Sequence, residues 1–283
     1  MSNEGVTVIG SGDISERVRR ELDHPLGAER QRKYRRIVLA AMGSIPWVGS
    51  FIAAAAAAEG EREQQKVNEL QQEWLEEHHG KLTDLKRTLL EILQRLESLG
   101  PEIEKRIQTE EYLGLVRKAF RVWDQADTQD KRKLIQNLLT NAGGTPLTAD
   151  DVVRLFIQWI DYYHEAHFAV IRAIFQNPGA TRSEMWEGVH GKPVREDSAE
   201  ADLFKLLIRE LSMGGVIRQH RETTADGQFL RKQPVRAPKG YASRTMKSAF
   251  DDGEQYELTE LGKQFVHYTM NEVVTRIGDQ PVN

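Results

Sequence analysis

The sequence contains no cysteine, which excludes disulfide bonds and thiolate metal sites. This absence fits a reducing cytosol, although many exported bacterial proteins share it. Also missing are a glycine-rich phosphate loop after a strand, a Gly-x-Ser-x-Gly nucleophile elbow and a His-Glu-x-x-His zinc motif. We therefore expect no enzymatic activity and no cofactor.

Histidines gather at two places, but neither place has a metal-binding pattern. His78 and His79 are neighbours, and neighbours on a helix point about 100° apart, so they cannot chelate one ion together. The second cluster has a His-x-x-His spacing, which does not bring both imidazoles to one zinc. It consists of Asp161, His164, Glu165 and His167. We predict no metal site at either place.

The composition is that of a polar, helix-rich chain. Its 283 residues are 39% hydrophobic and 29% charged, with nine prolines and a net charge of −4. These values predict a soluble protein of about two domains. They exclude a protein that binds nucleic acid through its bulk charge. We expect a cytoplasmic location, at most peripheral at the inner membrane.

One uncharged run, residues 37–58, stands out in this polar chain. Its length approaches what is needed to cross a hydrocarbon core of about 30 Å, and a cationic flank from Arg30 to Arg36 precedes it. Alanine, glycine, serine and proline make up much of the run, so insertion as a single span is marginal. A signal peptide is disfavoured, because the preceding segment is long and contains acidic residues.

The centre of this run predicts a turn between two short helices, since Gly43-Ser44 and Gly49-Ser50 bracket Pro46. Each leg, about 12–15 Å long, is too short to span a bilayer. The hairpin is either a buried or oligomer-forming element, or it dips into one leaflet of the inner membrane. The residues that we assign to membrane or assembly contact are Ile45, Trp47, Val48, Phe51 and Ile52.

Residues 63–109 predict a coiled coil, because seven aliphatic residues recur at spacings of three and four. They are Leu82, Leu85, Leu89, Ile92, Leu96, Leu99 and Ile103. An upstream apolar pattern has a different phase, which predicts a hinge or stutter at His78-His79-Gly80. The heptads fit an intermolecular coil in a homo-oligomer and two antiparallel helices within one subunit equally well.

The rest of the chain completes a mainly α fold. Residues 1–29 are expected to form a polar tail with one short helix, 30–62 the basic flank and apolar hairpin, and 110–147 a helical connector. In residues 148–283, three helices are followed by a strand at Val216-Ile217, a long polar segment, a returning strand at 255–258 and a last helix. This order predicts a winged helix with a small β-hairpin wing.

Two segments in this half carry a resemblance to a known family. They are Lys-Leu-Ile-Gln-Asn-Leu-Leu-Thr-Asn-Ala (133–142) and Tyr-Glu-Leu-Thr-Glu-Leu-Gly-Lys-Gln-Phe-Val (256–266). With a helix ending near Tyr162 between them, they resemble the Abi-alpha group of phage abortive-infection proteins over residues 110–270. The resemblance implies a bacterial, intracellular protein linked to phage defence. It transfers no active-site residue.

Charge is uneven in the predicted winged helix. Residues 216–247 carry eight cationic and two acidic residues inside an acidic chain. Six of the cations are our candidate contacts to nucleic acid or to an acidic partner: Arg218, Arg221, Arg231, Lys232, Arg236 and Lys239. Such a cationic wing could contact phosphates.

The start of the third helix has the opposite charge. It carries Glu196, Asp197, Glu200 and Asp202, offset by Lys205 and Arg209. Four carboxylates would repel a duplex at the part of the fold that enters a major groove. We therefore predict a winged helix that binds a protein partner, with weak, non-specific nucleic-acid contact. The alternative is a DNA-binding transcriptional regulator that dimerises through its helical N-terminal half.

Overall fold

The computed structural model describes residues 28–49, 61–144, 148–190, 195–222, 224–226, 228–230, 250 and 254–270, with the backbone alone described at 28–32, 61–72, 74–77 and 189–190. The fold is mainly helical with a small two-stranded antiparallel sheet, which confirms the predicted class at that level. The described residues up to Asp161 form one compact unit, and Tyr162–Met270 form a second. The second unit thus begins after the boundary that we predicted at residue 148.

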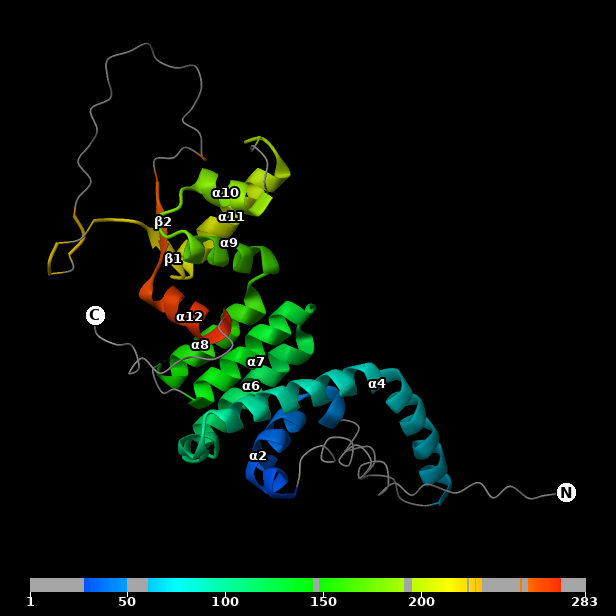
Figure 1. Cartoon of the computed structure of the whole chain (residues 1–283). Coiled ribbons are helices and arrows are strands. Elements are labelled where there is room, and N and C mark those ends of the chain that lie inside the picture. Colours follow the sequence, from blue (N-terminus) through cyan, green and yellow to red (C-terminus); the bar gives the residue numbers. More distant parts are fainter. Residues whose placement is uncertain are drawn as a thin grey trace, which may run out of the picture. The chain divides into compact units, whose positions relative to one another are not determined.

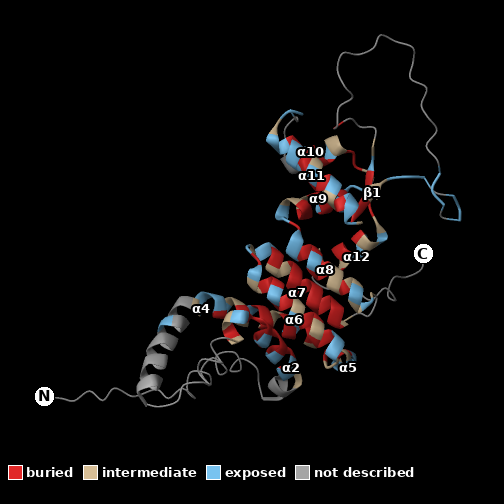
Figure 2. Cartoon of the chain, turned by 180° about the vertical axis from the view of Figure 1, so that it is seen from behind, coloured by how far each residue is buried: buried red, intermediate tan, exposed pale blue. Residues whose placement is uncertain are grey.

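The first unit is built of helices (Figure 1). They are α2 (Ala28–Ser44), α4 (Glu61–Ser98), the 3-10 turn Pro101–Ile103, α5 (Glu104–Ile107), α6 (Glu110–Gln125), α7 (Gln129–Gly144) and α8 (Asp150–Tyr162). Helix α7 packs against both α4 and α6, and α2 packs against α6. Buried residues therefore concentrate along α6, α7 and α8 (Figure 2).

The apolar run begins inside α2, which also takes in the cationic flank. Ser44 Oγ donates a hydrogen bond to the Ala41 carbonyl at 2.7 Å, and a bend at Ile45 separates α2 from a second helical stretch at 46–49. The bend lies within the predicted turn, although residues 46–49, which we assigned to the turn, are helical. The second predicted leg, from residue 50 onward, lies outside the described residues. Among the helices that are described, none has the length and apolarity needed to cross a membrane.

Five of the seven heptad residues lie on α4, which continues as one helix through His78, His79 and Gly80. Leu99 follows the helix, and Ile103 lies in the 3-10 turn. Six of the seven are buried within this one chain, and Leu99 is half-buried. Helix α4 packs on α7, whose C-terminal end approaches closely: a Cβ at Gly143 would lie 2.7 Å from Leu96 Cδ2. The intramolecular alternative therefore accounts for the burial of this face.

The second unit contains α9 (Glu165–Gln176), α10 (Arg182–His190), α11 (Ala199–Met213), β1 (Ile217–Gln219), β2 (Tyr256–Leu258) and α12 (Glu260–Met270). The two strands pair antiparallel, with Ile217 opposite Leu258. An isolated bridge adds Thr181, just before α10, to the residue preceding β2. Phe204 stacks on Phe250 and meets the edge of Trp186 inside the unit. The strands and three helices thus share one core.

The Leu-Thr-Glu-Leu-Gly segment connects β2 to α12 through close backbone packing. Thr259 Oγ1 donates to the Gly215 carbonyl at 2.6 Å and accepts from the Gly262 amide at 2.9 Å. A Cβ at Gly262 would lie 2.1 Å from the Val216 carbonyl oxygen. Only glycine fits there, so this motif is explained by packing.

Candidate binding site

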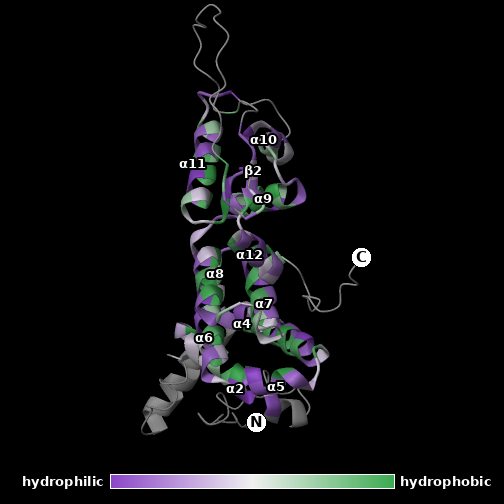
Figure 3. Ribbon diagram, turned by 90° about the vertical axis from the view of Figure 1, so that its left-hand side faces the viewer, coloured by the Kyte–Doolittle hydropathy of each residue, from purple (hydrophilic) through white to green (hydrophobic). Residues whose placement is uncertain are grey.

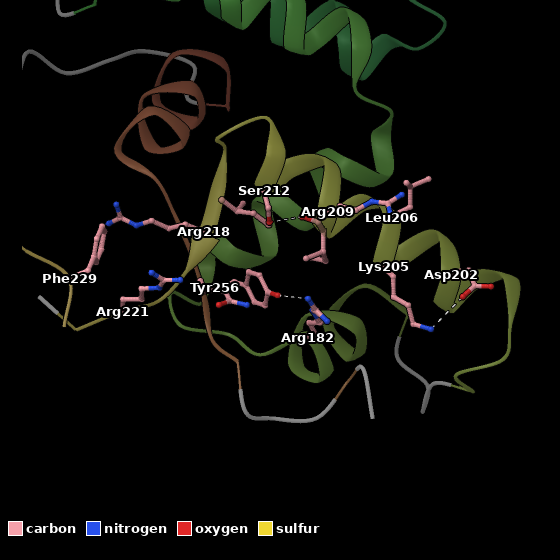
Figure 4. Close-up of a pocket in the computed structure, with 13 residues that line it drawn as sticks. Arg182, Asp202, Lys205, Leu206, Arg209, Ser212, Arg218, Arg221, Phe229 and Tyr256 are labelled. Carbon is pink, nitrogen blue, oxygen red and sulfur yellow. Dashed lines mark hydrogen bonds and ion pairs between the residues drawn. The ribbon is translucent and has the colours of Figure 1, made fainter. Parts of the chain in front are cut away.

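A pocket of about 790 Å³ opens on the second unit. Its walls come from α11, from β1 and the chain that follows it, from the first residue of α10 and from β2 (Figure 4). The residues that carry its chemistry are Arg182, Asp202, Lys205, Leu206, Arg209, Ser212, Arg218, Arg221, Phe229 and Tyr256. We call this surface the cationic groove.

Helix α11 is held in place by its inner face. Phe204, Ile208 and Leu211 on that face are buried. The helix starts where Ser198 Oγ accepts a hydrogen bond from the Ala201 amide at 3.1 Å, an N-cap that satisfies a free helix N–H. With the inner face fixed, the positions between these apolar residues point toward the groove and solvent.

The chain turns at the end of α11 and returns as β1. Gly215 has a φ of 74°, a left-handed conformation that favours glycine. The Val216 amide then donates to the Leu211 carbonyl at 2.9 Å. This tight connection places Arg218 on β1 across the groove from α11 (Figure 4).

Three of the five cations in the groove already have polar or acidic partners. Arg182 donates to the Tyr256 hydroxyl at 2.6 Å and lies 3.7 Å from a Glu254 carboxylate oxygen. Lys205 Nζ is 3.4 Å from Asp202 Oδ1 on the preceding turn. Arg218 donates to Glu257 at 2.7 Å. These cations shape the groove and are less available to a ligand.

Glu257 is kept ionised by the same contacts. Burial opposes its ionisation, but hydrogen bonds from His220 and Arg218 outweigh burial and hold the pKa of Glu257 below its ordinary value. His220 Nδ1 and the carboxylate are 2.9 Å apart. An ionised Glu257, itself outside the groove lining, therefore holds Arg218 in place at neutral pH.

Arg209 and Arg221 differ from the other cations. Both are exposed, and among the described residues neither has a hydrogen-bond or ion-pair partner. A guanidinium with five free donors is suited to bind carboxylate or phosphate in a bidentate manner. These two side chains are the groove's open positions for an anion.

Apolar side chains accompany this charge. Leu206 is 37% exposed and Phe229 is 50% exposed, and both line the groove. The Arg218 guanidinium lies 5.3 Å from the centre of the Phe229 ring, a cation–π contact. The groove thus offers a ligand both anion-binding and apolar surface.

The structure places two of the six candidate cationic contacts, Arg218 and Arg221, in the groove. The other four, Arg231, Lys232, Arg236 and Lys239, lie outside the described residues. Lys205 and Arg209, named in the sequence as the offset to the acidic helix start, also line it.

Arg182, Phe229 and Tyr256 also line the groove and were not among the predicted contacts. Arg182 reaches the groove because the bridge from Thr181 to Gln255 draws the start of α10 to β2. No local pattern predicts that long-range pairing. The only local feature in the sequence that marks Arg182 is its position directly after Thr181, which precedes a predicted helix.

The residues assigned to membrane or assembly contact occupy the first unit. Ile45 and Val48 are 0% and 2% exposed. Trp47 Nε1 donates to Asp124 Oδ1 at 2.5 Å. Phe51 and Ile52 lie outside the described residues. The described part of the apolar run is therefore packed against its own chain.

The second histidine cluster has a structural role. His167 is buried and its Nε2 lies 2.8 Å from Glu210 Oε2, while its Nδ1 accepts a hydrogen bond from the His164 amide at 3.1 Å. Nε2 joins α9 to Glu210 on α11, while Nδ1 caps the start of α9 itself. Within the described part of the chain, no group of three or more such side chains is placed to hold a metal ion.

No protein-family model, no curated protein and no solved structure matches this chain. The function must therefore be inferred from the groove and its surroundings.

Proposed function

We propose that this is a non-enzymatic bacterial interaction protein whose second unit binds an acidic segment of a protein partner in the cationic groove. The observation that carries the proposal is the pair Arg209 and Arg221, which lack partners among the described residues, beside the exposed Leu206 and Phe229. An occupant that satisfies both features carries carboxylates and apolar side chains together. Such an occupant is an acidic, amphipathic peptide.

The order of elements supports a winged helix. Helices α9, α10 and α11 are followed by the β1–β2 pair, and the bridge at Thr181 adds the short edge contact that precedes α10. In this interpretation α11 is the recognition helix and the segment between the strands is the wing. The groove then lies between the recognition helix and the base of the wing.

The distribution of charge favours a protein ligand over a duplex. Glu200 and Asp202 lie in the first turn of α11, and Glu196 just precedes it. The N-terminal residues of a recognition helix contact base edges, so carboxylates there repel DNA. The apolar residues of the groove add area that phosphates cannot use.

DNA binding remains the second candidate, because a recognition helix flanked by arginines is suited to a duplex. It predicts tight binding to one site at physiological salt. Our proposal instead predicts weak, sequence-independent duplex binding that falls steeply as salt is raised, since a few phosphate contacts supply it.

Fluorescence anisotropy with two labelled probes tests the proposal: a peptide of alternating Glu, Leu and Phe, and a random-sequence duplex. We expect the wild type to bind the peptide, and Arg209→Glu with Arg221→Glu to lose at least about tenfold in affinity, as loss of two charge-assisted contacts requires. The control is Lys263→Glu with Arg154→Glu, which makes the same charge change outside the groove. Equal losses in both variants, or tighter binding of the duplex, would contradict the proposal.

The helical first unit is proposed to support assembly through the apolar hairpin, since its heptad face is covered within the chain, with contact to the inner leaflet as the other use of the hairpin. We propose a cytoplasmic location, at most peripheral at the inner membrane. The burial of Ile45 and Val48 supports a packing role for the described half of the hairpin. Recovery of the protein in a carbonate-washed membrane fraction would support the membrane role.

A role in phage defence rests on the resemblance to the Abi-alpha group. Plaque formation on bacteria that express the wild type or the Arg209→Glu, Arg221→Glu variant tests it. We expect the wild type to lower the number of plaques and the variant to restore it. Equal plaque counts with and without the wild type would remove this role and leave the binding proposal standing.

A further inference from the structure

The outer face of α11 exposes three large apolar side chains. Leu203 is 52% exposed, Leu206 37% and Met213 81%. Positions separated by three, seven or ten residues fall on one side of a helix, so these side chains form a single stripe. Hydrophobic and hydrophilic residues accordingly alternate along α11 (Figure 3). We call this surface the outer stripe.

Charge changes sign along the same side of the helix. Asp202 and Arg209 are seven residues apart, which places them in nearly the same direction about two turns from each other. Asp202 is exposed and makes only a surface contact of 3.4 Å with Lys205, an exposed i,i+3 pair of small worth. Arg209 has no partner among the described residues. The outer stripe therefore has an acidic end and a basic end.

A surface with this arrangement is complementary to a copy of itself turned end for end. We propose that α11 pairs antiparallel with α11 of a second copy of this chain, with Leu203 and Leu206 of each copy at the centre. In a two-fold arrangement every contact occurs twice, so Arg209 of each copy faces Asp202 of the other. The apolar spacings of three and seven residues keep these side chains on the side of the helix that a second helix packed alongside would cover. Opposed helix dipoles add to the fit.

The size of the helix sets the strength of this pairing. Helix α11 has 15 residues, so a single helix pair buries less than the roughly 1,200 Å² of a standard stable interface. Weak, concentration-dependent dimerisation follows. It uses a different surface from the heptad face of α4, which is already covered by α7.

Pairing also affects the groove. The groove wall shares three residues with this side of α11 (Figure 4). Leu206 belongs to the outer stripe, and Asp202 and Arg209 lie beside it. A second copy that covers these side chains excludes a ligand from them. By linkage, an acidic peptide in the groove lowers dimerisation by the same factor by which dimerisation lowers peptide affinity. The pairing itself does not depend on which ligand the groove binds.

Sedimentation equilibrium from about 5 to about 500 µM, a range that spans a weak interface, tests the pairing. We expect the mass of the wild type to rise from monomer toward dimer. Leu203→Asp with Met213→Asp, at residues that do not line the groove, should keep the chain monomeric over the whole range. The matched control is Phe175→Asp, which alters a 48%-exposed residue on α9 and should dimerise like the wild type.

Charge exchange tests the antiparallel register. Asp202→Arg and Arg209→Asp should each weaken dimerisation at least about tenfold, while the chain carrying both changes, and an equimolar mixture of the two single variants, should dimerise again. Three results would each overturn the pairing. The wild type could stay monomeric, the Leu203→Asp, Met213→Asp variant could still dimerise, or the charge exchange could fail to restore dimerisation. Peptide binding by the monomeric Leu203→Asp, Met213→Asp variant reports separately on the groove. Its loss would contradict the proposed function and not the pairing.

Discussion

The heptad face of α4 and the outer stripe of α11 have the same kind of sequence pattern and opposite surroundings. On α4, Leu85 and Leu96 are both 0% exposed, covered within their own chain. On α11, Leu203 and Met213 are 52% and 81% exposed. The pattern is an apolar stripe at helical spacing in both cases. What differs is whether a neighbouring helix of the same chain can approach it.

The neighbours explain this difference. Helix α7 brings Gly143 to α4, where a Cβ would lie 2.7 Å from Leu96 Cδ2, so the helices come close because this glycine lacks a side chain. Helix α11 uses its other face for the core, where Phe204 and Ile208 are buried. Its outer stripe therefore stays exposed to solvent. An apolar stripe therefore predicts a partner, while the rest of the fold decides which chain supplies it.

The largest contrast should come from placing a charge on each stripe. Leu96→Asp buries a carboxylate where the side chain is fully enclosed and should lower the free energy of unfolding of the first unit by more than about 4 kcal/mol. Leu203→Asp should change the free energy of unfolding of the monomer by less than about 0.5 kcal/mol. Urea unfolding at low protein concentration measures both. Similar losses of unfolding free energy in the two variants would contradict the conclusion that one stripe is buried and the other exposed.

The apolar run of α2 allows the same contrast within one helix and its following turn. Ile45 is 0% exposed and Leu39 is 48% exposed. Ile45→Asp should cost at least about 3 kcal/mol of unfolding free energy, and Leu39→Asp less than about 0.5 kcal/mol. Circular dichroism during urea unfolding checks this. A folded Ile45→Asp protein that only loses membrane recovery would instead favour lipid contact for this run.

The second unit has its own sensitive point in the packing of α12 on the strand pair. Gly262→Ala places a methyl group against the Val216 carbonyl and should cost about 1–3 kcal/mol. Gly188→Ala is the matched change, because nothing lies within 4 Å of a Cβ there and alanine favours a helix. Trp186 is the one tryptophan of the second unit. When the other four tryptophans are replaced by phenylalanine, Trp186 fluorescence therefore reports the unfolding of this unit. Unequal effects on Trp186 and on the α4 helix would show that the two units unfold separately.

Much of this fold could be predicted from sequence because it depends on local periodicity. The heptads placed α4, and the order of helices and strands placed β1 and β2. The hinge or stutter predicted at His78-His79-Gly80 does not interrupt α4, because a change of heptad phase alters which face is apolar without breaking backbone hydrogen bonds.

The groove was predictable only in part. Arg218 and Arg221 stood out as cations in an acidic chain, but Arg182 and Tyr256 enter through pairing between segments more than seventy residues apart in the sequence. The outer stripe was hidden for another reason. Leu203 and Leu206 belong to the same apolar pattern as the buried Leu207 and Leu211, and composition does not show which aliphatic residues face inward. Only the packing of α9 and β1 on α11 decides that.

The smallest predicted effect concerns the inner face of α11, where His167 joins it to α9. Because Nδ1 accepts the His164 amide hydrogen bond, the ring proton is on Nε2 and is donated to the Glu210 carboxylate. Burial lowers the pKa of His167 below its ordinary 6.5, although the hydrogen bond to Glu210 acts in the opposite direction. The unfolded state therefore binds more protons than the folded state in the range between the lowered pKa and about 6.5.

Since the unfolded state gains protons there, the stability of the second unit should be complete above pH 6.5 and should decline as the pH falls below it. His167→Gln should flatten this decline, because glutamine does not titrate and keeps an amide that can donate to Glu210. Urea unfolding followed by Trp186 fluorescence between about pH 5 and pH 8 gives the change of the unfolding midpoint with pH. A wild-type midpoint that rises on acidification, or a slope unchanged in His167→Gln, would contradict the assignment of this histidine. The packing of α11 on α9 would then depend mainly on its apolar inner face, where Phe204, Ile208 and Leu211 are buried.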